Sequence, residues 1–172
     1  MRRHEQRLPR SLRVVVGLAR HADLPALAEL QAAAEDAERR FSPDLGTRLP
    51  DRRHARRCFK RTLCNATRRT FVARAGERLV GMIGVDLHQL RYRQYVVRRY
   101  AYLHSLFVEP RLRGRGVARR LVARGLAWAR RRGAQQVRLE MAQANRVARG
   151  LYESFGFQPR EVMFTLDLGG AS

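Results

Sequence analysis

The chain has 172 residues, enough for one domain with a substantial hydrophobic core. Its formal net charge is +21, almost entirely from arginine, because Lys60 is the only lysine. No apolar run reaches membrane-spanning length, and no apolar signal segment follows the basic residues 1–10, so we expect a cytoplasmic protein that does not enter a membrane. The two cysteines, Cys58 and Cys64, match neither a disulfide framework nor a metal knuckle, and we expect no bound metal.

The large positive charge allows two interpretations. An arginine- and alanine-rich composition spread over a solvated surface would need no partner. An acidic partner, such as a phosphorylated ligand, a nucleic acid or the ribosome, would use the charge directly. Arginine clusters at residues 52–57, 91–99, 111–120 and 130–132 indicate that part of the charge is organised.

The chain divides into a flexible basic arm at residues 1–11 and a single domain at residues 12–172. A β-branched run predicts a first strand at residues 12–18. A helix is then predicted, with Asp23 as its N-cap and Pro25 in its first turn. Its apolar stripe consists of Leu24, Leu27, Leu30 and Ala34.

The next segment predicts a second helix and a β-hairpin. After a loop at residues 41–50, Asp51 caps a very basic helix that ends near Cys64. Strands at 70–75 and 79–87 are joined by a turn at residues 75–78. Residues 88–99 mix Arg and Tyr and are predicted to extend the hairpin before a strand at 100–108.

A glycine-rich turn links that strand to a helix. The strand stops at Pro110, Gly114 and Gly116 follow, and apolar residues then recur at helical spacing from Val117. The first amides of a helix lack intrahelical acceptors and carry partial positive charge, and glycine lets a phosphate approach the backbone. The turn therefore predicts an anion cradle, although an ordinary strand-to-helix turn has the same pattern.

The C-terminal third predicts a strand at residues 136–141, a helix capped by Asn145 and ended by Gly156, and a last strand at 161–168. Gly133 has the position of a C′ glycine after the preceding helix. The inner side of the Asn145 helix is predicted to hold Val147, Ala148, Leu151, Tyr152 and Phe155. This order of elements predicts an α/β (α+β) fold, in which a mixed sheet has helices on both faces.

The pattern Arg113-x-x-Gly116-x-Ala118 resembles the signature of the GNAT superfamily of acyl-CoA-dependent N-acetyltransferases. The resemblance is strong over residues 100–157 and looser over 12–168. It implies a GNAT-like, mostly antiparallel central sheet, one N-acetyltransferase domain at 12–172, and acetyl-CoA as co-substrate. It extends to the ribosomal-protein N-terminal alanine acetyltransferase branch.

The resemblance implies roles for particular residues. The pyrophosphate would lie on the glycine turn, the pantetheine arm on the backbone of the preceding strand, and an Asn at the next helix would face the cofactor. The implied cofactor-binding residues are Leu106, Phe107, Val108, Arg113, Gly114, Arg115, Gly116, Val117, Ala118, Arg119 and Asn145. Tyr152 resembles the family's general acid, which protonates the departing thiolate; a core tyrosine is the structural alternative.

The general base has several candidates. Glu140 lies in a Leu-Glu-Met stretch that resembles the one carrying the base in the ribosomal-protein branch. Glu109 and His104 are alternatives, and a chain of water molecules would replace any of them. We place Glu140 first.

Two functions compete at this point. One is an N-acetyltransferase acting on a protein N-terminus or another amine. The other is a non-catalytic nucleic-acid or ribosome binder that keeps the fold and uses its Arg- and Tyr-rich residues 91–102. Nearly half of the 15 acids lie between positions 23 and 51, which predicts a less basic acceptor side for a cationic amine.

Overall fold

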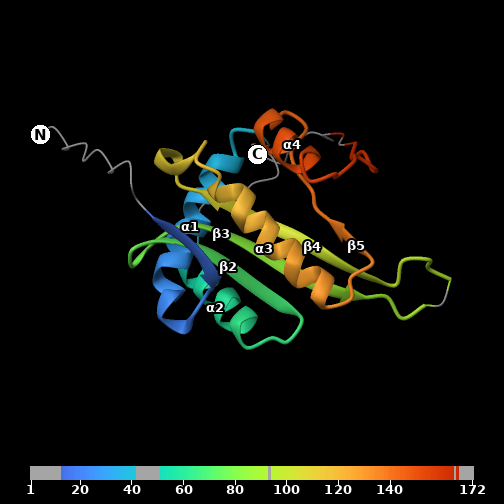
Figure 1. Ribbon diagram of the computed structural model, residues 1–172, viewed down its shortest axis with the longest axis horizontal. Coiled ribbons are helices and arrows are strands. Elements are labelled where there is room, and N and C mark those ends of the chain that lie inside the picture. The colour runs from blue at the N-terminus through green and yellow to red at the C-terminus, as the bar shows by residue number, and fades with distance from the viewer. Residues whose placement is uncertain (1–12, 42–50, 93, 165, 167–172) are drawn as a thin grey trace, which may run out of the picture.

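The computed structural model describes residues 13–41, 51–92, 94–164 and 166. A five-stranded sheet has the order β1-β2-β3-β4-β5 (Figure 1). All neighbours are antiparallel except β4 and β5, which are parallel. The strands are β1 Val14–Leu18, β2 Arg68–Ala75, β3 Arg78–Gln89, β4 Arg99–Val108 and β5 Gln136–Arg138. This is the predicted mixed, mostly antiparallel sheet.

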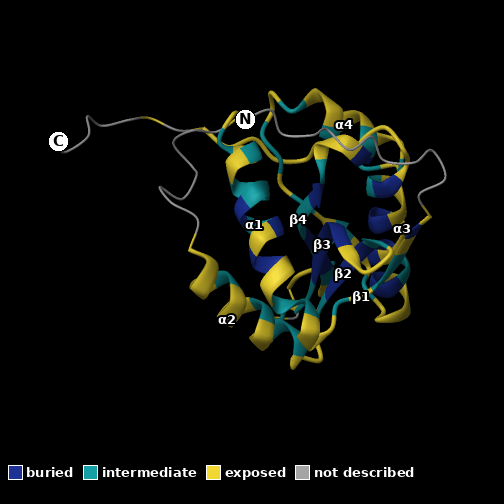
Figure 2. Ribbon diagram, turned by 90° about the vertical axis from the view of Figure 1, so that its left-hand side faces the viewer, coloured by how far each residue is buried: buried dark blue, intermediate teal, exposed yellow. Residues whose placement is uncertain are grey.

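Helices cover both faces of the sheet, as Figure 2 shows end-on. Helices α1 (Leu24–Glu38) and α2 (Arg52–Leu63) lie on one face, and α3 (Val117–Arg131) lies on the other. Strand alternation divides the core accordingly: Val72, Met82 and Phe107 pack beneath α1, whereas the neighbouring positions pack beneath α3. Helix α4 (Arg146–Glu153) contributes Tyr152 to the α3-side core.

Several predicted ends of elements are confirmed. The Asp51 side chain accepts a hydrogen bond from the His54 amide, and Asn145 accepts one from the Ala148 amide, so both act as N-caps. Gly133 follows α3 with φ 72°, as a C′ glycine does. The β2–β3 turn pairs Ala75 with Arg78.

The prediction for Asp23 was wrong in one respect. Its side chain does not cap α1, because it accepts a hydrogen bond from the Arg20 amide and pairs with Arg74. A short 3₁₀ turn, His21–Asp23, therefore precedes the helix.

The C-terminal strands also differ from the prediction. The strand predicted at 136–141 ends at Arg138, and residues 161–164 and 166 are not in a strand. Phe164 is 91% exposed. Alternating apolar residues predict one face of a strand, but they do not supply a neighbouring strand to pair with. Val147 is 87% exposed, not on the inner side of α4, because the buried stripe runs through Tyr152.

Some predictions fall on residues that the structure does not describe, namely the arm at 1–11 and most of the loop at 41–50. Within the described residues, no helix is both long and apolar enough to span a bilayer.

Candidate functional site

Strand β4 contains a bulge where its sequence approaches the glycine turn. Its register with β3 shifts between the pairs Gly84–His104 and Met82–Phe107, so one extra residue of β4 is accommodated. Ser105 has φ 52° and is the one non-glycine residue with positive φ in the described chain. Bulges of this kind re-aim backbone groups and are frequent beside functional sites.

Beyond the bulge, β4 has an open backbone edge. Its pairing with β5 ends at Tyr102–Arg138, so residues 103–108 have no strand partner on that side within the described structure. Phe107 and Val108 bury their side chains on opposite faces, which leaves the backbone as the group offered at the edge. An extended ligand can add to such an edge as a strand would.

The glycine turn continues from the end of this edge. A 3₁₀ turn at Pro110–Leu112 leads to Gly114 and Gly116, with φ 72° and 73°. A Cβ at either glycine would meet no atom within 4 Å, so their backbone borders open space. Gly116 is the N-cap of α3, and the amides of the first helical residues point away from the helix body. The arrangement fits a phosphate.

The arginines around the turn differ in what they contact. Arg113 donates through Nε to the Val108 carbonyl at 3.0 Å and lies over the Phe107 ring, and Arg119 donates to Ser154 Oγ at 2.9 Å. Arg115 is exposed and has no hydrogen bond or ion pair with the described residues. Arg120 is exposed and donates through Nη1 to the Val14 carbonyl at 2.8 Å.

Tyr152 lies on the buried side of helix α4. Burial raises the pKa of its hydroxyl to about 12, with a further contribution from the Glu38 carboxylate at the end of α1. Its ring packs edge-on against Phe157 at 5.7 Å. No described residue hydrogen-bonds to the hydroxyl, so it remains available as a donor.

Glu140 follows β5 and reaches Tyr102 on β4. Burial raises the pKa of Tyr102, and the Glu140 carboxylate raises it further. Glu38 contributes to this pKa shift as well. Glu38 therefore acts on both phenols, and Glu140 acts on Tyr102.

His104 forms a second polar group on the same strand. Its Nε2 lies 3.4 Å from Asp86 Oδ1 and its Nδ1 lies 3.1 Å from Ser105 Oγ. Burial acts to raise the pKa of Asp86, but His104 and Arg68 outweigh it, so the pKa lies below its ordinary value. Gly84 leaves room for the imidazole, because a Cβ there would overlap the ring.

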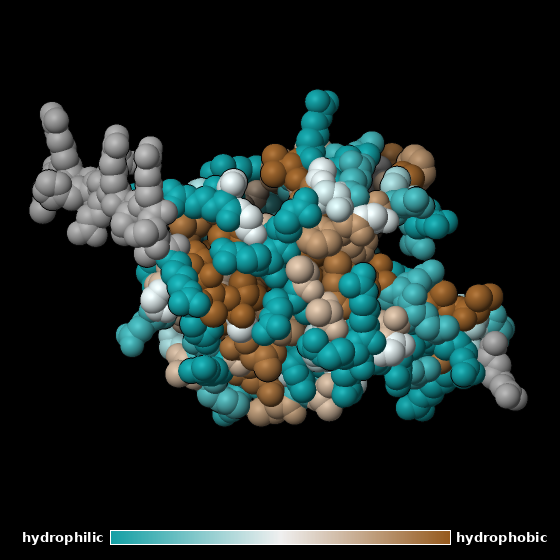
Figure 3. Space-filling model, in the orientation of Figure 1, coloured by the Kyte–Doolittle hydropathy of each residue, from teal (hydrophilic) through white to brown (hydrophobic). Residues whose placement is uncertain are grey.

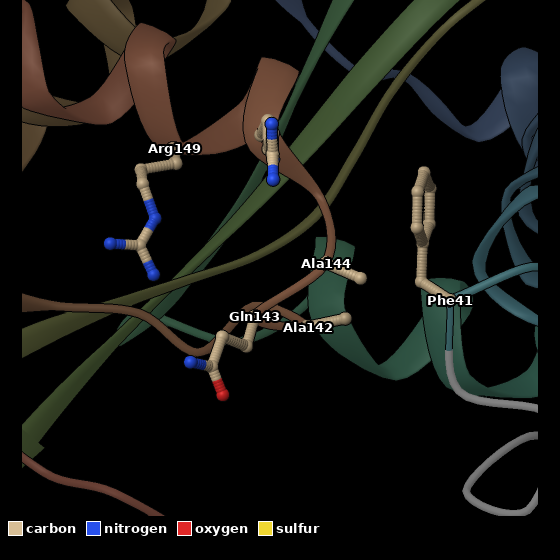
Figure 4. A pocket seen from close by; sticks show the side chains of 6 residues that line it. Phe41, Ala142, Gln143, Ala144 and Arg149 are labelled. Atoms are coloured by element: carbon tan, nitrogen blue, oxygen red, sulfur yellow. The ribbon is translucent and has the colours of Figure 1, made fainter.

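An open hollow of about 820 Å³ lies between the end of α1 and the start of α4. Figure 4 shows Ala142 and Ala144 pointing toward Phe41, with Gln143 and Arg149 farther from it. The hollow is lined by Phe41, Ala142, Gln143, Ala144, Arg146 and Arg149.

Comparison with known proteins agrees with this geometry. The model of the acetyltransferase (GNAT) family matches residues 30–157, which include α3, the open edge and Tyr152. The chain belongs to the GNAT family.

Individual GNAT relatives share the fold at low identity. An uncharacterised N-acetyltransferase of Methanocaldococcus jannaschii is 30% identical over 93 residues, which are 54% of this chain and 40% of that protein. A predicted acetyltransferase with acetyl-CoA from Clostridium acetobutylicum has a TM-score of 0.74 and 18% identity, covering 91% of this chain and 97% of that one. The aminoglycoside enzyme AAC(6')-Iy, in complex with a bisubstrate analogue, has a TM-score of 0.70 and 18% identity over 90% of this chain and 98% of its own.

The GNAT signature accounts for most of these groups, but Tyr102 was missed from sequence. The pairing of β4 with β5 brings Tyr102 toward Glu140. Glu38, one of the acids counted between positions 23 and 51, lies near enough to Tyr102 and Tyr152 to raise both pKa values. The candidate base Glu109 instead pairs with Arg78 at 3.0 Å, which ties its carboxylate to the β2–β3 hairpin.

Proposed function

We propose that the protein is an N-acetyltransferase that moves an acetyl group from acetyl-CoA to a primary amine, either a protein N-terminus or a small amine. The observation that carries this proposal is continuity: the open backbone edge of residues 103–108 leads directly into the glycine turn at the start of α3. One extended ligand with a pyrophosphate at one end fits both features.

The parts of acetyl-CoA would divide between the two features. The amides of Val117, Ala118 and Arg119 would bind the pyrophosphate, with Arg115 adding charge from solvent. The edge at Leu106–Val108 would pair with the amide groups of the pantetheine arm. Asn145 caps α4 by accepting from the Ala148 amide, and the start of this helix would face the cofactor.

The transfer would proceed by direct attack. The amine nitrogen bonds to the thioester carbonyl carbon, the C–S bond breaks, the amine proton passes to a base, and the thiolate receives the proton of Tyr152. A phenol with a pKa of about 12 stays protonated at neutral pH but is a weaker acid than a thiol with a pKa near ~8.5. Proton transfer to the thiolate is therefore uphill, and reprotonation of Tyr152 from solvent would draw it forward and close the cycle.

Glu140 is our first choice of base, since its carboxylate acts on Tyr102, the residue of β4 at which pairing with β5 ends. His104 is the competing choice, because its Nε2 lies 3.4 Å from Asp86 Oδ1 on the same strand as the open edge. The variants Glu140→Gln and His104→Asn separate them in a pH profile of kcat/KM. We expect Glu140→Gln to remove the acidic limb and cost roughly a hundredfold or more, with His104→Asn retaining it; the reverse pattern would transfer the role to His104.

The first experiment asks whether the protein binds and uses acetyl-CoA. We expect acetyl-CoA to raise the Tm, because a ligand of the folded state must stabilise it, and thiol release to depend on an added amine or peptide. The second candidate, a non-catalytic nucleic-acid or ribosome binder, predicts neither effect. Panels of small amines and N-terminal peptides would then identify the acceptor class.

A further inference from the structure

One end of the sheet carries positive charge that forms no ion pair with a carboxylate of the described residues. Between Asp86 and Glu140 the only acid is Glu109, which lies at the other end of β4 and pairs with Arg78. Strand ends and the end of α3 gather here, at the right-hand side of Figure 1. We call this surface the basic end; its residues are Arg91, Arg98, Arg99, Arg130, Arg131, Arg132 and Arg138.

Hydrogen bonds hold the elements of the basic end together. Arg99 donates through Nη1 to the Arg132 carbonyl at 3.1 Å, and Gln135 Oε1 accepts from the amides of Arg98 and Arg99. Arg138 lies over the Tyr100 ring at 4.3 Å. These partners are neutral, so the guanidinium groups are ordered while keeping their full charge.

Elsewhere in the described structure five arginines form ion pairs with acids, whereas none of the basic-end arginines does. Ion pairs join Arg74 to Asp23, Arg52 to Glu29, Arg39 to Asp36, Arg68 to Asp86 and Arg78 to Glu109. A cluster of arginines without a neighbouring acid is the electrostatic pattern of a surface that binds a polyanion.

The hairpin connection at the basic end adds exposed aromatic rings. The β3–β4 ladder ends at Gln89–Arg99, and the chain beyond it projects from the body of the molecule (Figure 1). Tyr92 is 68% exposed and Tyr95 46% exposed. Figure 3 shows mostly hydrophilic residues over this end, with a small apolar group at its extremity.

We propose that the basic end binds single-stranded nucleic acid, with the arginines on the phosphates and Tyr92 and Tyr95 stacking on bases. Stacking needs bases that are not already stacked in a duplex, which favours a single strand. The exposed apolar area is too small for a membrane anchor, since Val96 is accompanied mainly by Tyr and Arg. The surface lies at the opposite end of β4 from the glycine turn and does not depend on acetyl transfer.

The test uses fluorescence anisotropy with a fluorescein-labelled 12-nucleotide single-stranded RNA and the full chain. The basic-end variant carries Arg91→Gln, Arg98→Gln, Arg130→Gln and Arg131→Gln, whose side chains have no hydrogen bond with the described residues. The charge-matched control carries Arg40→Gln, Arg53→Gln, Arg149→Gln and Arg160→Gln. We expect the basic-end variant to bind more than tenfold more weakly than the control. Its slope of log K against log salt should be shallower by up to about 3, at about 0.7 per lost phosphate contact.

A second variant, Tyr92→Leu with Tyr95→Leu, keeps apolar bulk and removes the aromatic faces. We expect roughly tenfold weaker binding to the single strand and little change for the matching duplex. Equal losses in the basic-end and control variants, or unchanged binding by the leucine variant, would overturn the proposal in favour of diffuse charge attraction. Binding to vesicles with anionic lipid but not to RNA would overturn it in favour of a membrane.

A wild-type circular dichroism spectrum and a cooperative thermal unfolding transition show that each variant is folded. The Tyr152→Phe variant should bind the RNA as the wild type does. A failure of RNA binding is therefore distinguishable from a failure of the proposed acetyl transfer.

Discussion

At the scale of single residues, Tyr152 carries the sharpest prediction. Tyr152→Phe keeps the buried ring against Phe157 and deletes only the hydroxyl. We expect kcat to fall roughly tenfold to a thousandfold with the acetyl-CoA KM nearly unchanged, since acid catalysis acts on the transition state. Steady-state kinetics measures both, and wild-type turnover would make Tyr152 a core residue only.

The same substitution predicts a change in alkaline stability. The folded-state pKa of Tyr152, about 12, exceeds the unfolded value near 10, so the folded state holds this proton more tightly. Its contribution, about 2 to 3 kcal/mol, is present below pH 10 and is lost as pH rises toward 12. Urea unfolding between pH 9 and 11.5 should show a smaller loss for Tyr152→Phe than for the wild type, whereas Tyr95→Phe at an exposed site should follow the wild type.

Residue positions were predictable where a local motif carried them and not where tertiary pairing did. Asn145 caps its helix and Tyr152 lies on the buried side of the same helix, and Gly114 and Gly116 lie in one turn, as expected. The approach of Glu140 to Tyr102 depends on a parallel β4–β5 register that no local pattern encodes. Ser105 carries no sequence signal for positive φ, because the bulge depends on how β3 and β4 pair.

At the scale of elements, the junction of β4 and α3 is testable with a matched pair of variants. Gly116→Asp places a carboxylate where the pyrophosphate is expected to bind. Gly76→Asp makes the same change in the β2–β3 turn, where φ is also positive and a Cβ also meets open space. The backbone strain is therefore comparable, and only the position differs.

We expect Gly116→Asp to weaken CoA binding by at least a hundredfold in calorimetry, because repulsion replaces amide hydrogen bonds to the phosphates. Gly76→Asp should bind CoA as the wild type does. Equal affinity in both folded variants would remove the glycine turn from the proposed cofactor site.

Elements with local signals were predicted well. The caps at Asp51 and Asn145 and the tight turn after Ala75 were all readable from short patterns. The strand predicted at 161–168 was not found among its described residues. Alternating apolar residues predict which face of a strand is buried, but not which strand it pairs with.

At the scale of the whole molecule, charge polarity predicts how the acceptor is selected. Asp36 pairs with Arg39 and Glu35 accepts from Gln31, whereas Glu38 lies near enough to Tyr152 and Tyr102 to raise both pKa values. Replacing Glu35, Asp36 and Glu38 by Gln or Asn should raise the KM of a cationic acceptor and leave the acetyl-CoA KM alone. Glu38→Gln alone should give most of the effect, and the salt dependence of acceptor binding should weaken.

A control with Glu29→Gln, Glu77→Gln and Glu161→Gln removes the same charge from other surfaces. It should leave both KM values near wild type. An unchanged acceptor KM in the α1 variants at low salt would mean that these acids do not select the acceptor.

The open edge of β4 also affects the tendency of the protein to aggregate in solution. An unpaired row of backbone groups on a strand is a template for association with another copy, so the ligand-free protein should be the form most prone to aggregate. The net charge of +21 opposes that association by mutual repulsion, and salt weakens the repulsion. Purification in high salt without acetyl-CoA should therefore be the least favourable condition for solubility, and a ligand that fills the edge should act as its protecting strand.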